Sequence, residues 1–400
     1  MRAGIYLGWV GNENLGDEAI FNYCRERFSS LRWSSFEQLL YAPNIPQFVA
    51  RRGRSFRHLA HVFKEELLYQ KRLREAAVNS LFQLASSLGG EIGLLGGGTI
   101  INQSDYILAS YVAVRNRTKS LVPVLGAGVM PPDFASAKSD WKDRRKNWVA
   151  ALEELPIVGV RGPLSKNLLD EVGARNVVVC GDPAVAYHSD FAKKLSIARA
   201  DRPLRVAINT GDCLRQLWGN MSDVQDSLIG LARSLKMAGH QIQVIPVWPE
   251  DISPCVDLAK KAGLERCAVS PALTSHTRFL KAIEHVDIVV ALKLHAGILS
   301  AAANVPFVLL AYQPKALDFA ASLKWEQFTI RTDELTSSKL IEIVSLLIDE
   351  LPTKKRELCT GMCRLVHLFE EYCRKIEPML LGKSPMGLTD RKVPCEFDAA

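Results

Sequence analysis

Short apolar runs alternate with longer amphipathic segments along most of the chain, and this alternation limits the possible folds more than any other feature. Runs rich in Val, Ile and Leu predict strands, and in the first half of the chain they lie at 3–8, 91–95, 121–126, 156–161 and 177–180. The segments between them predict helices at 17–28, 58–88, 104–118, 138–154 and 163–172. Strands that alternate with helices are typical of a parallel sheet with crossover helices.

The alternation is interrupted by the polar, basic stretch 189–205 and then resumes. Further strands are predicted at 204–209, 241–247, 287–292 and 306–311, and closing helices at 337–350 and 355–376. We therefore expect an α/β protein with two Rossmann-like domains whose parallel sheets face a cleft. The expected boundaries are 1–190 for the N-terminal domain, 203–350 for the C-terminal domain and 351–400 for a last helix with an irregular tail.

The composition is that of a soluble globular protein, with 48% hydrophobic and 23% charged residues. The longest apolar stretch, 289–315, contains Lys293 and His295, which argues against a membrane span. The nine cysteines form no C-x-x-C pair, and Cys359 and Cys363 have no second pair with ligand spacing, so no metal is expected. These features favour a reducing compartment, and we expect a cytoplasmic location.

The segment 51–77 carries much of the basic excess in a chain whose net charge is +7. Its apolar residues recur at roughly helical spacing, which predicts an amphipathic helix with a basic face. Such a face is most often a solvated surface. The functional interpretation, which stays open, is a peripheral contact with anionic lipid at the inner face of the membrane. Nucleic acid is not expected as a partner.

Basic side chains follow three of the predicted strands at the point where each strand ends. Strand 287–292 leads into Lys293 and His295, strand 306–311 is followed by Lys315, and strand 156–161 ends on Arg161. In open parallel sheets, ligands bind beyond the carboxyl ends of the strands, where helix N-termini also point. Together these groups predict a site for an anion.

Glycine-rich loops follow two other strands. In "LGWVGNENLGDEAI" (7–20) the glycines permit a tight loop, and Asp17 stands at the start of a helix. Asp17 either caps this helix, or it accepts a hydrogen bond from a substrate hydroxyl or takes the proton of that hydroxyl. Neither this loop nor "GLLGGGTII" (93–101) has the G-x-G-x-x-G dinucleotide fingerprint. The residues expected to line an acceptor are Gly11, Asn14, Gly16, Asp17, Gly97 and Gly98.

With these motifs in view, the chain resembles the polysaccharide pyruvyl transferase family. The similar segments are "GWVGNENLGDEAI", "LLGGGTI", "GVRGPLSKNLL", "GDPAV" and "KLHAGILSAAANVPFVLLAYQPK", in this order. The resemblance implies a fold similar to the glycosyltransferase-B architecture. It also implies transfer of pyruvate from phosphoenolpyruvate to two hydroxyls of a sugar, which forms a cyclic ketal and releases phosphate.

The resemblance also implies roles for individual residues. Arg161, His295 and Lys315 match positions that the family uses to bind phosphoenolpyruvate. The family's usual Arg-Leu-His is Lys293-Leu294-His295 here, and lysine keeps the charge but loses the planar two-pronged contact of arginine. We expect His295 and Asp17 to be catalytic, and Arg161, Lys315 and Lys293 to hold the phosphate.

The expected partners are phosphoenolpyruvate and a sugar acceptor, whose polyprenyl or nucleotide linkage stays open; no cofactor is expected. Two other classes of function remain. The first is a nucleotide-sugar-dependent glycosyltransferase, since the same architecture serves both reactions. The second is a sugar- or lipid-binding protein without catalysis.

Overall fold

The computed structural model describes residues 2–8, 10, 13–35, 90–103, 105–118, 120–134, 143–188, 202–213 and 217–381. The basic segment 51–77, Gly11 and most of the expected domain connection lie outside these residues.

The first half of the chain forms an α/β unit around a sheet with the strand order β2-β1-β3-β5, and every described pairing in it is parallel. Its strands are β1 (Arg2–Leu7), β2 (Leu31–Ser35), β3 (Gly90–Gly96) and β5 (Val124–Leu125). Further short parallel pairs join β4 (Thr99–Ile101) to β6 (Gly128–Val129), and β7 (Val158–Val160) to β8 (Val177–Val179). The helices around these strands are α1 (Leu15–Arg27), α6 (Asp105–Thr118), α7 (Arg145–Leu152) and α8 (Pro163–Asp170).

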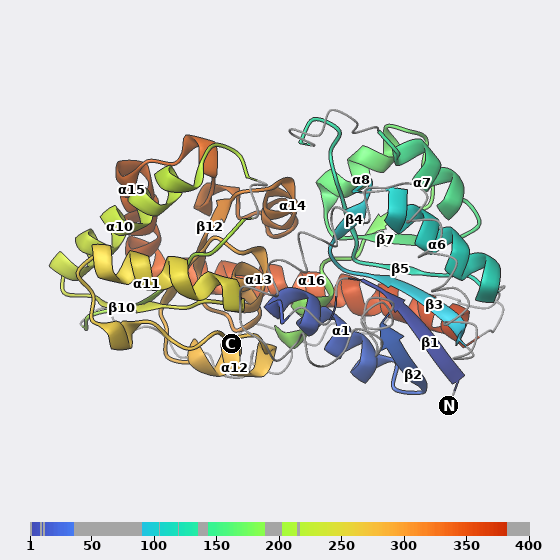
Figure 1. Ribbon diagram of the computed structural model, residues 1–400, viewed down its shortest axis with the longest axis horizontal. Helices are drawn as coiled ribbons and strands as arrows, with labels where there is room; N and C mark the ends of the chain where they lie inside the picture. The colour runs from blue at the N-terminus through green and yellow to red at the C-terminus, as the bar shows by residue number, and fades with distance from the viewer. Residues whose placement is uncertain are drawn as a thin grey trace, which may run out of the picture.

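The second half forms a similar unit around a parallel sheet with the order β10-β9-β11-β12-β13. Its strands are β9 (Arg205–Asn209), β10 (Gln241–Val244), β11 (Ile288–Ala291), β12 (Phe307–Ala311) and β13 (Thr329–Arg331). Its helices are α10 (Met221–Met237), α11 (Ile252–Lys261), α12 (His276–Ala282), α13 (Leu294–Ala302), α14 (Pro314–Leu323) and α15 (Ser337–Asp349). Figure 1 shows the two units side by side, with α1 between them.

Burial explains why the central strands could be found in the sequence. Every residue of β11 and β12 is buried, because helices cover both faces of a parallel sheet. The hydrophobic core is continuous across the two units, since one cluster of buried side chains includes Tyr6 and Leu15 together with Val290 and Leu309. The two units therefore share buried apolar surface.

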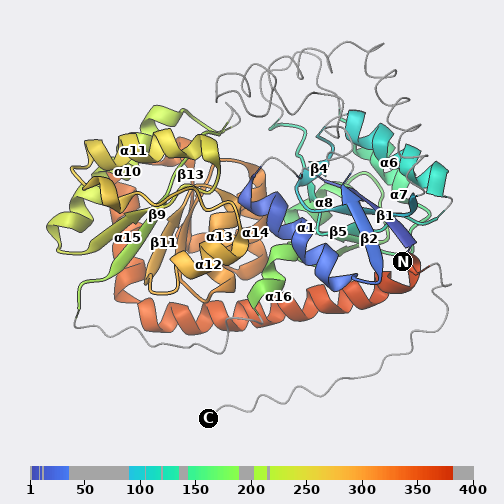
Figure 2. The same ribbon diagram turned by 60° about the horizontal axis from the view of Figure 1, so that its bottom comes forward.

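The last described helix, α16 (Leu351–Leu380), runs beneath both units, as Figure 2 shows. In the N-terminal unit, the Tyr372 hydroxyl donates to the carbonyl of Val124 and accepts from the amide of Gly159, the latter at 2.8 Å. In the C-terminal unit, Arg364 donates to the carbonyl of Ser322 at 2.6 Å. The helix expected within 351–400 therefore stabilises both halves of the molecule.

Most of the predicted strands and helices are confirmed, with different bounds, whereas the helix predicted at 58–88 lies outside the described residues. The strand expected at 121–126 is limited to Val124–Leu125, because Pro123 lacks an amide hydrogen and Gly126 has a left-handed φ of 66°. Of the helix expected at 138–154, residues 138–142 lie outside the described part of the chain, and α7 begins at Arg145. Strands β2, β4, β6 and β13 were not predicted.

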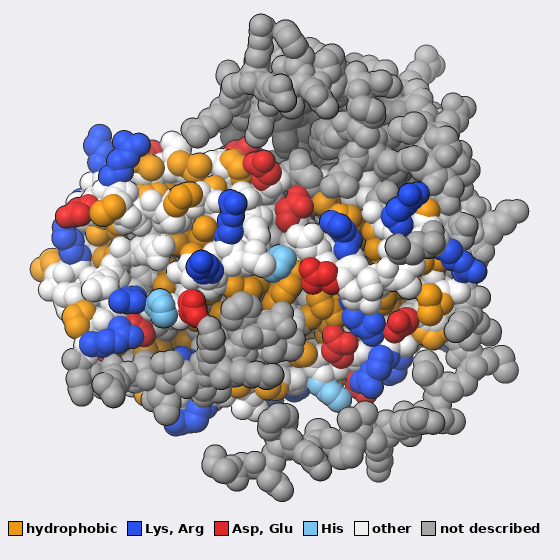
Figure 3. Space-filling model, turned by 90° about the horizontal axis from the view of Figure 1, so that it is seen from below, with side chains coloured by type: hydrophobic (Ala, Val, Ile, Leu, Met, Phe, Trp, Pro, Cys, Tyr) orange, Lys and Arg blue, Asp and Glu red, His pale blue; other side chains and the backbone are white. Residues whose placement is uncertain are grey.

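The described helices can be compared with a membrane span in length and apolar character, and the described surface can be characterised by its charges. Within the described residues, no helix combines the length and the apolar character that crossing a bilayer requires. On the face drawn in Figure 3, Lys and Arg side chains lie interspersed with Asp and Glu side chains.

Candidate active site

Residues from both units meet where their strands end. In the N-terminal unit, Arg161 follows β7 and Asp17 lies in the first turn of α1. In the C-terminal unit, His295 lies in the first turn of α13 after β11, and Lys315 in the first turn of α14 after β12. Interactions among these four groups and Asp182 define the candidate site.

The carboxylate of Asp182 links the two units at the centre of this site. Its Oδ2 lies 2.9 Å from Nε of Arg161 and 3.5 Å from Nε2 of His295, and Asp182 is fully buried. Burial alone would raise the pKa of Asp182, but the charges of His295 and Arg161 outweigh it and lower the pKa to about 2. A carboxylate that is ionised at neutral pH therefore lies next to a guanidinium from one unit and an imidazole from the other.

Arg161 has donor capacity left after this pairing. Its side chain is 1% exposed, and its Nη1 donates to Oγ1 of Thr99 at 3.3 Å. Within the described part of the chain, its Nη2 has no hydrogen-bond partner. A buried guanidinium donor without a partner is costly, so an anionic ligand that accepts from it would be strongly favoured.

Asp17 has the electrostatic character of a proton acceptor. Burial raises its pKa to about 6, against the charges of His295, Lys315 and Arg161, which lower it. The side chain that caps α1 is Asn14, whose Oδ1 accepts from the amide of Gly16 at 3.1 Å. Asp17 is therefore not needed as the cap. The two carboxyls of the site are therefore suited to different tasks. Asp17, with a pKa near 6, can exchange a proton near neutral pH, whereas Asp182, with a pKa near 2, stays ionised.

Lys315 adds a second cation to the site. Burial, followed by the charge of Arg161, lowers the pKa of its ammonium group to about 8. The group is still mainly protonated at neutral pH. Its Nζ lies 5.0 Å from the centre of the Tyr312 ring, which provides a favourable cation–π contact.

Lys293 is held in a neighbouring cluster formed by the loops after β9 and β10. Its Nζ lies 3.4 Å from Oδ1 of the fully buried Asp251, donates to the carbonyl of Asp212, and stands 5.4 Å from the Trp248 ring centre. Burial raises the pKa of Asp251 to about 6, against the charge of Lys293. Because the ammonium group already has these partners, the phosphate contact expected of Lys293 stays a prediction.

The glycines of the "LLGGGTI" turn shape the backbone. Gly97 has a φ of 62°, its amide donates to the carbonyl of Leu125 at 3.0 Å, and a β-carbon there would lie 2.5 Å from Ile20. The turn thus allows α1, which carries Asp17, to approach β3 closely. The carbonyl of Gly98 accepts from the amide of Gly128 at 2.7 Å. The acceptor contacts expected of Gly97 and Gly98 stay predictions.

A side chain of the C-terminal unit caps the helix that follows Arg161. Oδ1 of Asp318, in α14, accepts from the amides of Leu164 and Ser165 at 2.9 and 3.2 Å, and its Oδ2 accepts from the Ser165 hydroxyl at 2.6 Å. A β-carbon at Gly162 would lie 2.2 Å from Asp318, so only glycine permits this approach. These hydrogen bonds join the start of α8, next to Arg161, to α14, which carries Lys315.

Sequence reasoning did not single out Asp182, Asp251 or Asp318. Two features of the sequence could have indicated Asp182 as a site residue. It lies just beyond the end of the strand predicted at 177–180, and it belongs to the segment "GDPAV". Asp251 and Asp318 carried no comparable signal, because their importance depends on burial against segments distant in the sequence.

Comparisons with known proteins agree with the described fold. A sequence model of the family described as polysaccharide pyruvyl transferase matches residues 14–314, more than half of the 400-residue chain. No curated protein matches the chain.

Several solved structures are similar in fold. S. aureus MnaA, in a co-structure with UDP, has a TM-score of 0.59 at 11% identity, covering 98% of this chain and 100% of that chain. A putative UDP-N-acetylglucosamine 2-epimerase from Listeria monocytogenes has a TM-score of 0.56 at 10% identity, with coverages of 96% and 98%. A glycosyltransferase from Rickettsia africae has a TM-score of 0.52 at 9% identity, with coverages of 96% and 99%. These similarities show an α/β fold of the glycosyltransferase-B type, as expected from the sequence.

Proposed function

Because the chain belongs to the polysaccharide pyruvyl transferase family, we propose that it transfers the pyruvyl group of phosphoenolpyruvate to two hydroxyls of a sugar. The products are a cyclic ketal and phosphate. The observation that carries the proposal is the Asp182 carboxylate, which holds Arg161 of one unit and His295 of the other within 2.9 and 3.5 Å.

The donor is assigned to the cations of the site. Phosphoenolpyruvate presents a phosphate and a carboxylate. The site offers the Lys315 ammonium group and a buried guanidinium whose Nη2 has no hydrogen-bond partner among the described residues. Both anionic groups are matched by charge-assisted hydrogen bonds, which are roughly twice as strong as neutral ones. Arg161 and Lys315 therefore bind the donor and stabilise the departing phosphate.

The chemistry starts at His295. His295, whose Nε2 lies 3.5 Å from Oδ2 of Asp182, donates a proton to the methylene carbon of phosphoenolpyruvate, and the adjacent carbon gains oxocarbenium character. A sugar hydroxyl forms a bond to that carbon. The carbon–oxygen bond to phosphate then breaks, and the second hydroxyl closes the ketal.

Asp17 is the base for the attacking hydroxyls. Its pKa near 6 means that it is ionised at neutral pH yet basic enough to take a proton in the transition state. Of the two hydroxyl protons released, one replaces the proton that His295 gave to carbon and the other leaves with phosphate. The reaction is balanced without a redox partner.

The acceptor is a saccharide, as the family description supports. The linkage of that saccharide stays open. A polyprenyl-linked acceptor would place the protein at the inner face of the membrane through the segment 51–77, which lies outside the described residues. Sedimentation with anionic liposomes at low salt tests this location, and protein that stays in the supernatant would argue against it.

The donor is tested by the change in melting temperature that phosphoenolpyruvate induces, since a ligand that binds only the folded state raises it. We expect a rise for the wild type and for Arg115→Ala, which removes a partly buried arginine that hydrogen-bonds Ala151 away from the site. We expect none for Arg161→Ala or for the charge-conserving Arg161→Lys. A rise with UDP and none with phosphoenolpyruvate would instead support a nucleotide-sugar-dependent glycosyltransferase.

A further inference from the structure

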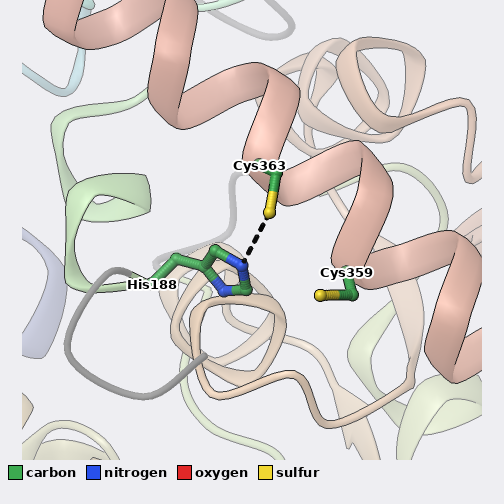
Figure 4. A group of neighbouring side chains, drawn as sticks. All are labelled: His188, Cys359 and Cys363. Carbon is green, nitrogen blue, oxygen red and sulfur yellow. Dashed lines mark hydrogen bonds between the residues drawn. The ribbon is translucent and has the colours of Figure 1, made fainter. Parts of the chain in front are cut away.

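A cluster of soft ligands lies outside the site described above. It consists of His188, which follows the 3-10 helix η1 (Pro183–Tyr187), and of Cys359 and Cys363 in α16. Figure 4 shows both thiols on the side of α16 that faces the imidazole. One nitrogen and two sulfur atoms of the cluster all lie within 4.8 Å of one another.

The orientation of His188 leaves one ring nitrogen available to a ligand. Nδ1 lies 2.9 Å from the carbonyl oxygen of Ala302. A carbonyl can only accept, so this contact assigns the proton to Nδ1 and a lone pair to Nε2. Nε2 points to Sγ of Cys363 at 3.7 Å. A histidine that donates from one nitrogen to a backbone carbonyl and offers the other is the usual arrangement of a metal ligand.

The two cysteines are arranged in a way that suits a common ligand. They stand at i and i+4, so they share one face of α16, and both are free thiols. In a tetrahedral zinc site with bonds of about 2.3 Å to sulfur, two sulfur atoms lie about 3.8 Å apart. Small side-chain rotations would bring the three atoms from their present spacing to that geometry.

We propose that Nε2 of His188 and the thiolates of Cys359 and Cys363 bind one Zn²⁺ ion, with water in the fourth position. The donor set favours this metal class, because thiolate and imidazole suit zinc whereas Mg²⁺ and Ca²⁺ require oxygen ligands. The cluster includes no carboxylate.

Bound there, the ion would cross-link two elements of the fold, while its fourth position stays open to water. His188 lies six positions after Asp182, at the far end of the short helix η1 that Asp182 caps with its side chain. Binding would fasten this segment to α16 and, through Ala302, to the end of α13. Zinc would therefore stabilise the element that positions the central carboxylate, at a distance from the reacting atoms.

The test is a zinc titration of metal-free, fully reduced protein against a competing chelator, repeated with Cys359→Ser and Cys363→Ser. The matched control is Cys267→Ser, which replaces another exposed cysteine that lies beside Glu265. We expect one zinc ion per chain for the wild type and the control. Each of the other two variants should lose at least about 100-fold in affinity, because even outer-shell changes cost 10–100-fold.

Co²⁺ gives a second readout that does not depend on stability or activity. Thiolate-to-cobalt charge-transfer absorption should appear with the wild type and the control, and should weaken with each serine variant. Stoichiometric zinc that both serine variants keep would overturn the proposal. So would the absence of zinc binding, or a Cys359–Cys363 disulfide that persists under mild reduction.

Discussion

The backbone of Gly16 touches the ring of His295, so closely that a β-carbon at position 16 would lie 1.8 Å from Nδ1. No side chain fits between them. The first turn of α1, which carries Asp17, is thus placed directly against the proposed proton donor. This contact joins the N-terminal unit to the C-terminal unit at the centre of the site.

Gly16→Ala should therefore displace the imidazole from Asp182. We expect kcat/KM to fall by about 100-fold, the cost of misplacing a reacting group by about 1 Å. Steady-state release of phosphate measures the effect. The control is Gly361→Ala in α16, where the nearest atom would lie 3.3 Å away in Leu323 and activity should be kept. Full activity of Gly16→Ala would show that the His295 ring position is not critical.

Asp17→Asn tests the proposed base. Asp17 has a pKa of about 6, so kcat/KM of the wild type should fall as the pH drops through that value and the carboxylate becomes protonated. The asparagine variant should lose about 10²- to 10⁴-fold in rate and also lose this acidic limb. Asp226→Asn, on the exposed side of α10, should leave the profile unchanged. An acidic limb that persists in Asp17→Asn would exclude Asp17 as its origin.

The same substitution should stabilise the protein. The folded-state pKa of Asp17 is raised above its ordinary value of 3.8, so the folded protein binds this proton more tightly than the unfolded chain. The stability this group gives below pH 4 is lost as the pH rises to about 6. At pH 7 the ionised carboxylate destabilises the fold, and Asp17→Asn should recover up to about 3 kcal/mol in urea unfolding. A lower stability at pH 7 would contradict this.

Asp182→Asn should have the opposite effect. The pKa of Asp182 is lowered from 3.8 to about 2, so the charged pair adds stability that is fully present above pH 4 and is lost as the pH falls to about 2. Removing one partner of a buried pair costs about 3–5 kcal/mol at pH 7, because Arg161 would remain buried and unpaired. Asp170→Asn, which breaks the exposed pair with Lys166, should cost less than about 1 kcal/mol. Equal losses in urea unfolding would argue against the central role of Asp182.

Donor binding should weaken in alkaline solution. The pKa of Lys315 is lowered to about 8, so its charge is lost above that pH and the affinity for phosphoenolpyruvate should fall by at most about tenfold per pH unit. Arginine stays charged, so Lys315→Arg should bind with little change between pH 7 and 9. Calorimetric titration measures both. If the affinity of Lys315→Arg for phosphoenolpyruvate fell in the same way at alkaline pH, the titrating group would be one other than Lys315.

Asp318→Ala tests the cap between the units. Loss of the bonds to Leu164 and Ser165 should cost about 1–2 kcal/mol of stability and raise the KM for phosphoenolpyruvate, because Arg161 precedes the capped helix. The control is Asn220→Ala, which removes the cap of α10 within the C-terminal unit. It should cost similar stability and leave the KM unchanged. An unchanged KM in Asp318→Ala would show that the cap does not affect the binding of phosphoenolpyruvate.

The sequence allowed the alternating fold and three basic groups of the site to be predicted, for clear physical reasons. Strands such as β11 and β12 are buried on both faces and therefore appear as continuous apolar runs. The short strand β2 has the sequence "LRWSS", in which polar residues hide the pattern. Arg161, Lys315 and His295 could be found because strand ends and helix starts have local signals.

Other residues of the site were not singled out, because their roles depend on long-range packing. Asp182 acts through partners on two units, and Asp318 caps a helix more than 150 positions earlier in the chain. His188 and Cys363 lie 175 positions apart, and only the path of α16 brings them into contact. The sequence spacing therefore indicated only the two cysteines and not His188, the third protein ligand of the proposed zinc site.

The path of α16 also has a consequence for biosynthesis. The amide of Gly159 and the carbonyl of Val124 bond to Tyr372, which leaves the ribosome more than two hundred residues after either of them. Domains generally fold from the N-terminus as the chain is made. The N-terminal unit therefore gains these two hydrogen bonds only after the C-terminal unit has been translated. Its completion thereby reports that the C-terminal unit has already emerged.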